Sequence, residues 1–349
     1  MMNSHLTRRA IGGIALGAAL SGGRAMAAET EAELVEGARR EGQLVWYTTL
    51  VVGQIVRPLA QRFEQKYPGV KVNFVPAPWQ ETALRITNEG RAGQPRGDMF
   101  DGGATFYPLH AAGLVAPYVV RSAASYPAAF KEPSGLWTAN IIQPSTPAVN
   151  TDMVRPADIP RSYEDLLHPR WRGRMAWPDS PSVGGPPGLI GDVLMTMGPE
   201  RGMQYLERLA QQRIANVPSN QRVVLDQCIS GQYPLVLSIY NYHAAISAAQ
   251  GAPVQWLKLE STVVSFGAMA LVKNAPHPNA TKLFLEFNMS QEGQAIYANA
   301  GYVPANPAVP SKIAGLRPED GNFRGNVISA GDFIGHEAEW TGIYRRLFQ

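Results

Sequence analysis

The stretch LVWYTTLVVGQIVRPLAQRFEQKYPGVKVNF (residues 44–74) decides the fold, because its apolar residues follow two different periods. Residues 44–47 form a short apolar run, and the apolar side chains at 70, 72 and 74 alternate as in a second strand. Between these runs Ile55, Leu59 and Phe63 share one helical face, and Tyr67-Pro68-Gly69 ends the helix. Strand, helix and strand in this order predict a βαβ unit within a parallel sheet.

The same alternation continues on both sides of this unit. The capping-box spacing of Thr30 and Glu33 predicts a helix that ends at Gly42. We expect further helices at 80–91, 105–113 (opened by Thr105), 199–212, 222–229, 241–249, 277–289 and 291–300, a short helix from 162, and strands at 98–100, 173–177, 233–240, 254–259 and 262–272. A length of 349 residues and a proline-rich stretch between 118 and 160 favour two α/β domains.

The charge balance argues against a nucleic-acid partner. Residues 1–27 contain Arg8, Arg9 and Arg24 and no acidic residue. Without these arginines the 31 basic residues become 28, equal to the 28 acidic residues. A neutral chain lacks the basic excess that binding to a polyanion requires.

Residues 1–27 have the pattern of an export signal. Paired arginines at 8 and 9 precede a small and apolar run at 10–20, and Ala25-Met26-Ala27 has the form that a signal peptidase cleaves. We expect a twin-arginine-like signal peptide cleaved near Ala27, with an ordinary secretory signal as the alternative, and a periplasmic location. No later run is apolar for about 18 residues, so membrane insertion is not expected. Cys228 is the only cysteine and is expected to be a buried, small apolar residue.

No motif in the sequence calls for an enzyme. The chain has no Gly-x-Ser-x-Gly elbow, no phosphate-binding Gly-x-x-x-x-Gly-Lys loop and no dinucleotide glycine fingerprint. His336-Glu337 begins a zinc-protease pattern, but Trp340 stands where the second histidine should be. We therefore expect neither catalysis nor a cofactor nor a resident metal.

Loops at predicted strand ends offer hydroxyl groups and free backbone amides instead. They are Tyr47-Thr48-Thr49, the stretch DGGAT at 101–105 and Ser182-Val183-Gly184-Gly185. Each stands near a helix start, an arrangement that binds anions. The alternative interpretation is that they are ordinary turns and helix caps.

Short motifs along the chain are specific as a set, although each is weak alone. They are FEQKYPGVKV (63–72), GDMF (97–100), NTD (150–152), PRWRG (169–173), GAPV (251–254), ALVKNAPHP (270–278) and SQEGQ (290–294). Together they resemble the extracellular solute-binding proteins of ABC importers, and in particular the ferric-iron-type branch.

The resemblance implies an α/β, type II-like periplasmic-binding-protein fold. Two lobes of mixed sheets flanked by helices would hold a ligand in the cleft between them and close by a hinge motion. The first lobe would comprise 28–135 and 265–349, and the second lobe 136–264, with chain crossings near 138–150 and near Tyr240 or 262–268. The implied partners are a permease and an ATPase, and the protein itself is expected to be a monomer.

The ligand is less well indicated by the resemblance. Ferric members of the family use two adjacent tyrosines, with a histidine and a glutamate in many cases, because Fe(III) prefers anionic oxygen donors. Here the tyrosine pair reads Asn241-Tyr242, residues 47–54 contain no histidine, and Gly103 stands in the glutamate position. We therefore favour a small organic anion such as a carboxylate, phosphonate or phosphate ester. The alternatives are ferric iron held by Tyr240 and Tyr242, with His243 nearby, and a sensor that presents the bound ligand to a receptor.

Under the organic-anion hypothesis, Ser182 and Gly184 would donate to the anion and Arg222 would add a charge-assisted bond. The expected ligand-binding residues are Thr48, Thr49, Gly103, Thr105, Ser182, Gly184, Arg222, Tyr240, Asn241 and Tyr242. Tyr242 is the strongest of these candidates. The competing interpretation makes Arg222 a solvated helix residue and Tyr240 a core residue at the end of a buried strand.

Overall fold

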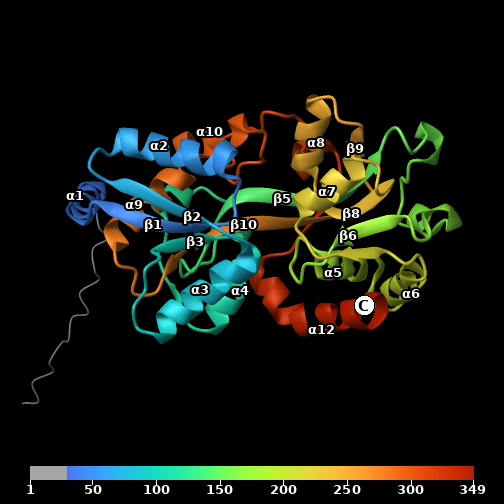
Figure 1. Cartoon of the computed structure of the whole chain (residues 1–349), viewed down its shortest axis with the longest axis horizontal. Coiled ribbons are helices and arrows are strands. Elements are labelled where there is room, and N and C mark those ends of the chain that lie inside the picture. Colours follow the sequence, from blue (N-terminus) through green and yellow to red (C-terminus); the bar gives the residue numbers. More distant parts are fainter. Residues whose placement is uncertain (1–29) are drawn as a thin grey trace, which may run out of the picture.

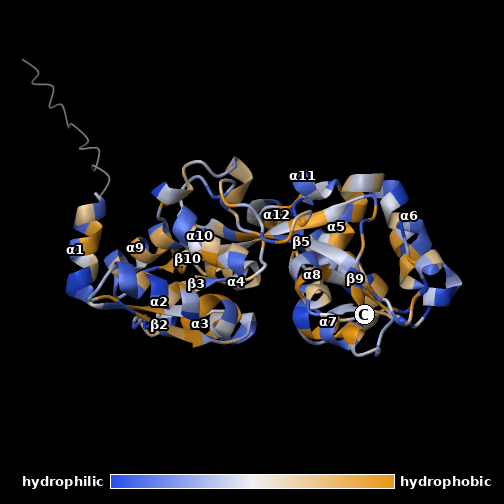
Figure 2. Ribbon diagram, turned by 90° about the horizontal axis from the view of Figure 1, so that it is seen from above, coloured by the Kyte–Doolittle hydropathy of each residue, from blue (hydrophilic) through white to orange (hydrophobic). Residues whose placement is uncertain are grey.

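The computed structural model describes residues 30–349, so the predicted signal peptide at 1–27 lies outside the described residues. Two lobes lie side by side along the long axis of the molecule (Figure 1). Strands β5 (Thr138–Asn150) and β10 (Thr262–Val272) run between them as antiparallel neighbours. Seen from above, the lobes meet at a narrow junction where β5 passes (Figure 2). The crossings expected near 138–150 and 262–268 coincide with these two strands.

The first lobe is built on the βαβ unit that the sequence predicts. Strand β1 (Gln43–Thr48) lies parallel to β2 (Lys71–Pro76) and to β3 (Met99–Asp101). A π-helical turn (Val52–Val56) and α2 (Arg57–Lys66) connect β1 to β2. Strand β10 then pairs antiparallel with β3 and with β4 (Val115–Ala116), so the sheet is mixed rather than wholly parallel.

The second lobe continues the same sheet. Strand β5 pairs antiparallel with β8 (Leu235–Tyr240) and with β9 (Val254–Trp256). Strand β6 (Met175–Pro178) lies parallel to β8 and to β7 (Ala215–Val217), and β11 (Gly325–Val327) pairs with β10. The resulting order, β2-β1-β3-β10-β5-β8-β6-β7, passes from one lobe into the other without a break.

Helices cover this sheet at both ends of the molecule. They are α1 (Glu31–Glu41), α3 (Trp79–Arg91), α4 (Gly103–Ala111), α5 (Pro186–Met197), α6 (Pro199–Ala210), α7 (Gln221–Ile229), α8 (Asn241–Ala249), α9 (Pro278–Met289), α10 (Gln291–Asn299), α11 (Pro318–Gly321) and α12 (Ala330–Phe348). Short 3₁₀ turns occupy Arg121–Ala123, Ala128–Phe130, Pro156–Asp158, Glu164–Leu167 and Pro169–Trp171. None of the helices within 30–349 has the length and apolar character needed to cross a membrane.

Local signals account for the elements predicted correctly. Thr30 and Glu33 form the expected capping box, and Gly42 ends α1 in the left-handed region with φ +72°. The start of α4 was predicted wrongly. Gly102 caps this helix and Thr105 lies inside its first turn. No prediction covered α5, which begins with Pro186-Pro187 and has no side-chain cap, or α12.

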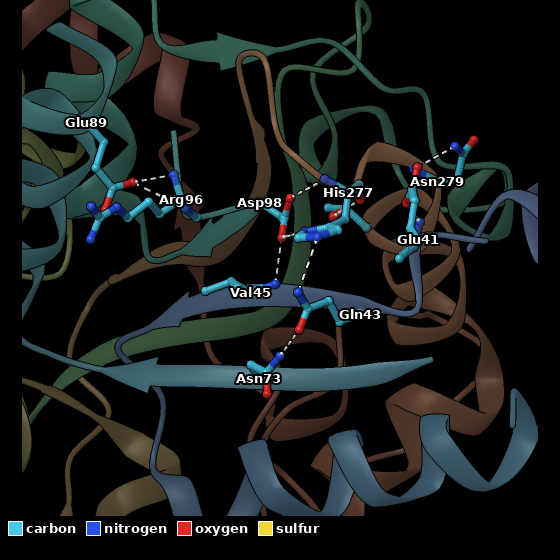
Figure 3. Close-up of polar contacts among 12 residues, drawn as sticks. Glu41, Gln43, Val45, Asn73, Glu89, Arg96, Asp98, His277 and Asn279 are labelled. Carbon is cyan, nitrogen blue, oxygen red and sulfur yellow. Dashed lines mark hydrogen bonds and ion pairs between the residues drawn. The ribbon is translucent and has the colours of Figure 1, made fainter. Parts of the chain in front are cut away.

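Two carboxylates tie elements of the first lobe together, Asp98 beside the short strand β3 and Glu41 at the end of α1. Asp98, at the amino end of β3, accepts hydrogen bonds from the Val45 amide (2.7 Å) and from the amide (2.7 Å) and Nδ1 (2.9 Å) of His277, as Figure 3 shows. Glu41 likewise accepts from the side-chain amide of Asn279 at the start of α9. These bonds hold β1 and β3 near α9 at the end of the sheet where β1 begins. Asp101, at the other end of β3, belongs to the candidate site.

Each lobe has its own apolar core. In the first lobe the Phe284 ring lies 5.3 Å from Trp46 and 5.1 Å from Phe63. In the second lobe Trp177 is fully buried with residues of α5 and α6. Cys228 is buried as expected, and burial raises the pKa of its thiol to about 12.

The C-terminal helix differs from the expected lobe division. Residues 265–349 were assigned to the first lobe, but the apolar side chains of α12 are buried in the core of the second lobe, against α5. The C-terminus accordingly lies at the second lobe (Figure 1). The close approach depends on Gly191, because a Cβ atom there would lie 2.7 Å from the ring of Trp340. The remaining boundaries of the division stay a prediction.

Gly191→Ala tests this packing. The added methyl group forces Trp340 away from α5, so we expect the free energy of unfolding to fall by about 1–3 kcal/mol, measured by urea denaturation. Gly335→Ala is the matched control, because a Cβ at this position in α12 meets nothing within 4 Å. It should stabilise the protein by up to about 1 kcal/mol through helix propensity. Equal stability of the two variants would contradict the docking of α12 on α5.

Candidate functional site

The carboxyl ends of β1 and β3 form the first-lobe part of the candidate site. The Asp101 carboxylate accepts hydrogen bonds from the Thr49 amide (2.8 Å), the Thr49 hydroxyl (2.6 Å) and the Trp46 indole (2.8 Å). Thr48 is buried, and its hydroxyl accepts from the Leu50 amide at 3.1 Å. These bonds give the loop after β1 a defined shape, with Thr49 exposed beside Asp101.

The first turn of α4 lies next to this loop. Gly102 has φ +97°, and a Cβ there would lie 3.0 Å from the Thr49 hydroxyl, so a glycine is required. Thr105 is fully buried, and its hydroxyl has no hydrogen-bond partner among residues 30–349. Tyr107 follows Gly103 by one helical turn, and its hydroxyl reaches back to 3.8 Å from where a Cβ of Gly103 would stand.

The loop at 180–185 before α5 supplies the second-lobe part. The hydroxyls of Ser180 and Ser182 lie 3.0 Å apart. The Gly184 carbonyl accepts from the Ser145 hydroxyl (3.3 Å) and from Gln221 (3.2 Å), which ties the loop to β5 and α7. A Cβ at Gly184 would lie only 2.5 Å from the Tyr240 hydroxyl, so the phenol rests directly on this glycine.

A cluster of aromatic side chains closes the site where β8 ends. The rings of Tyr240 and Tyr242 are stacked, with centroids 5.6 Å apart, and Tyr302 packs on Tyr242 at 4.8 Å. Tyr302 comes from the segment after α10 and belongs to the first-lobe core. Tyr242 is only 1% exposed and its hydroxyl accepts from Gln143 at 3.4 Å, whereas Tyr240 is partly exposed. Tyr240 therefore lies nearer the solvent than Tyr242.

The aromatic side chains are electrically neutral. Burial raises the pKa of Tyr240 and Tyr242 above the usual tyrosine value and that of Tyr302 to about 12. Burial and the neighbouring Arg222 lower the pKa of His243 to about 3. Neutral phenols donate hydrogen bonds, and oxyanions accept them, so the arrangement suits an oxyanion ligand.

Several predicted residues meet in this region, and others have structural partners instead. The structure brings Thr49, Gly103 and Thr105 to one side, and Gly184, Tyr240 and Tyr242 with the loop of Ser182 to the other. Arg222 pairs with Asp226 and donates to the Ser247 hydroxyl at 3.0 Å. Asn241 is fully buried and donates to the Leu316 carbonyl at 2.9 Å. Their contacts with a ligand stay predictions.

Sequence reasoning did not select Asp101, Tyr107, Gln143, Ser145 or Tyr302. Both Asp101 and Tyr107 were within reach, because Asp101 is the first residue of the glycine loop that the sequence singled out and Tyr107 follows that loop by two residues. A helix started at Gly103 rather than Thr105 would have placed Tyr107 one turn from the loop. Gln143 and Ser145 lie on a crossing strand and carry no local signal. Tyr302 arrives through tertiary packing alone.

Asp101→Asn tests the role of this buried carboxyl. The amide cannot accept from all three donors, so we expect destabilisation of about 1–3 kcal/mol. Burial raises the pKa of Asp101 above 3.8. The contribution of Asp101 to the free energy of unfolding is therefore complete below pH 3.8, and part of it is lost as the pH rises through the pKa of the folded state. The difference in unfolding free energy between wild type and variant should therefore decrease from mildly acidic to neutral pH in urea titrations.

Asp165→Asn is the control for this pH dependence. Hydrogen bonds from the Arg161 amide and from Ser162 lower the pKa of Asp165 below 3.8. The contribution of Asp165 to the free energy of unfolding is lost only as the pH falls through that lower pKa. The difference in unfolding free energy between wild type and Asp165→Asn should therefore stay constant from mildly acidic to neutral pH. A constant difference for Asp101→Asn as well would contradict the assigned shift.

The chain is similar to known proteins in sequence and in structure. It is 23% identical over 266 residues to iron uptake protein A1 of Synechocystis, covering 70% of this chain and 72% of that protein. The periplasmic binding protein AfuA from Actinobacillus pleuropneumoniae, with exogenous fructose-6-phosphate bound, superposes with a TM-score of 0.74 at 22% identity over 88% of this chain and 98% of that one. A Trichodesmium protein (IdiA, FutA) in complex with iron and citrate ligands gives a TM-score of 0.70 at 21% identity, over 88% and 100%.

These similarities confirm the two-lobe periplasmic-binding-protein fold that the sequence motifs implied. The family model described as bacterial extracellular solute-binding protein matches residues 58–316, which contain both crossing strands, the start of α4 and the second-lobe half of the candidate site. The chain belongs to the bacterial extracellular solute-binding proteins.

Proposed function

We propose that this protein is the periplasmic substrate-binding component of an ABC importer and that it captures a small organic anion between its lobes. The proposed ligand class is a carboxylate, phosphonate or phosphate ester. A permease and an ATPase would take over the released ligand, and the protein would bind without turning the ligand over. The family membership supports the role in solute binding, and the geometry of the site supports the ligand class.

The supporting observation is the set of neutral donors that the two lobes bring together. Each lobe contributes a tyrosine hydroxyl beside a glycine at the start of a helix, Tyr107 at Gly103 and Tyr240 at Gly184. The start of α4 offers unpaired backbone amides and a partial positive charge, whereas α5 opens on Pro186-Pro187, which have no N–H, and adds only the charge of its helix end. Hydroxyls and amides of this kind bind an oxyanion without a metal or a full positive charge.

Ferric iron is the second candidate, and it has a specific basis. Tyr240 and Tyr242 are stacked at the end of β8, where the sequence motif places the tyrosine pair. Two relatives favour this candidate, an iron uptake protein and a protein in complex with iron and citrate. Iron would take these phenols as phenolates, and burial, which raises the pKa of both, makes that deprotonation more costly. Among the described residues, no group of three or more His, Cys, Asp or Glu side chains could hold a metal ion.

A ligand screen on the exported, processed protein separates these candidates. Native mass spectrometry and iron analysis identify a co-purifying ligand, and thermal shifts with fructose-6-phosphate, methylphosphonate, succinate and ferric citrate rank the classes. Binding to the folded state alone stabilises it by about 2.7 kcal/mol at a hundredfold excess over Kd. A shift with an organic anion supports the proposal. Stoichiometric iron, or a shift with ferric citrate alone, would replace it with iron transport. Uptake assays in cells without the permease distinguish transport from sensing.

Gly184→Ala tests the second-lobe half of the site. The new methyl group would lie 2.5 Å from the Tyr240 hydroxyl and must displace the phenol. We expect the affinity for the anion that binds wild type to fall by about tenfold or more, the loss of one hydrogen bond to a charged group. Calorimetry measures the change, with Gly335→Ala as the matched control. Unchanged affinity of Gly184→Ala would remove Tyr240 from the site.

A further inference from the structure

Tyr107 occupies a position that its packing alone does not explain. Its ring lies on the Phe333 ring of α12, with centroids 5.0 Å apart, and edge-on to Phe106 at 6.2 Å. Its hydroxyl points back along α4 toward Gly103 and has no hydrogen-bond partner among residues 30–349. A phenol held in an apolar contact by its ring usually finds a partner for its hydroxyl.

The Tyr240 hydroxyl of the second lobe is in the same situation. It rests on Gly184, and it too lacks a hydrogen-bond partner in the described part of the chain. Both phenols stand beside the crossing strands: a Cβ at Gly103 would lie 3.6 Å from the Phe266 carbonyl oxygen of β10, and Tyr240 lies opposite Ser145 of β5. Thr105, fully buried in the same turn as Gly103, adds a third hydroxyl without a partner.

We propose that Tyr107 is a ligand-binding residue whose hydroxyl, together with that of Tyr240, binds the oxyanion group of the ligand across the two lobes. This inference rests on the proposed function and adds to it the residue through which the first lobe binds the anion. The phenols donate one hydrogen bond each, and the backbone amides in the first turn of α4 are further donors on the first-lobe side. A phosphate, phosphonate or carboxylate has enough acceptor oxygens for this set.

The contact with Phe333 gives Tyr107 a second property. Phe333 is fully buried in the second-lobe core, whereas α4 belongs to the first lobe. The Tyr107–Phe333 contact therefore crosses between the lobes, where α4 and α12 lie side by side (Figure 1). Since α12 is anchored on α5 through Trp340, the position of the C-terminal helix sets where the Tyr107 ring stands. Phe333 is thus a positioning residue for the ligand site.

Tyr107→Phe tests the proposal, because it removes only the hydroxyl and keeps the ring on Phe333. The probes are inorganic phosphate, fructose-6-phosphate, methylphosphonate and succinate, each titrated into wild type and variant by calorimetry. For every probe that binds wild type, Kd should rise about tenfold or more, with the unfolding midpoint unchanged. Tyr205→Phe is the matched control. It removes a hydroxyl that donates to the Tyr163 carbonyl at 2.9 Å in the second-lobe core, so it should lower stability and leave Kd unchanged.

The outcomes distinguish a failure of the role proposed for Tyr107 from a failure of the proposed function. If wild type binds a probe and Tyr107→Phe binds it equally well, Tyr107 is not a ligand residue, and the proposed function stands. If wild type binds none of the probes, the proposed function fails and this inference fails with it. Phe333→Leu keeps an apolar side chain but loses the ring contact, and it should raise Kd by a few-fold. An unchanged Kd for Phe333→Leu would overturn the positioning role of α12.

Discussion

The antiparallel pairing of β5 with β10 is the constraint on which the rest of the structure depends. The pairing extends from Val263 opposite Ser145, in the second lobe, to Met269 opposite Thr138, in the first. Every residue of β10 is buried, and in the sheet of residues 30–349 the β5–β10 pair joins the first-lobe strands to the second-lobe strands. The register slips between Gly267 and Ala268, and a Cβ at Gly267 would lie 2.4 Å from the Asn140 side chain. The two crossing strands thus fix which loops of the two lobes face each other.

The candidate site follows from this framework. Strand β3 lies beside β10, so the loop after Asp101 and the start of α4 stand next to the crossing. Strand β8 lies beside β5, with Tyr240 opposite Ser145, so the Tyr240 phenol lies near the crossing on the second-lobe side. The donors that result are hydroxyls and backbone amides, while Asp101 is occupied by Trp46 and Thr49. Neutral donors bind an anion with a modest desolvation cost, because no ionised side chain has to be stripped of water.

Much of the fold could be predicted from the sequence. The limits of α8 and β10 were predicted to the residue, because the apolar pattern of each segment and the turn residues beside it lie within a few positions of the chain. The failures have physical reasons. Helix α5 opens on two prolines without a side-chain cap, so no start signal marks it. Helix α12 is placed by Trp340 on Gly191, a contact between distant segments. For the candidate site, the sequence singled out the glycine and hydroxyl loops, but not Tyr107, because the start of α4 was predicted two residues late, and not Tyr302, which carries no local pattern.

The sequence by itself determined the βαβ start, most helices and strands, the solute-binding family and the loops that flank the site, because periodicity, caps and turn residues act within a few positions of the chain. Only the tertiary structure decided that Tyr240 is more exposed than Tyr242, that Arg222 donates to Ser247, and that the C-terminal helix joins the second lobe. Which hydroxyls keep a partner and which are left for a ligand depends on packing between segments far apart in sequence, and no local pattern encodes that packing.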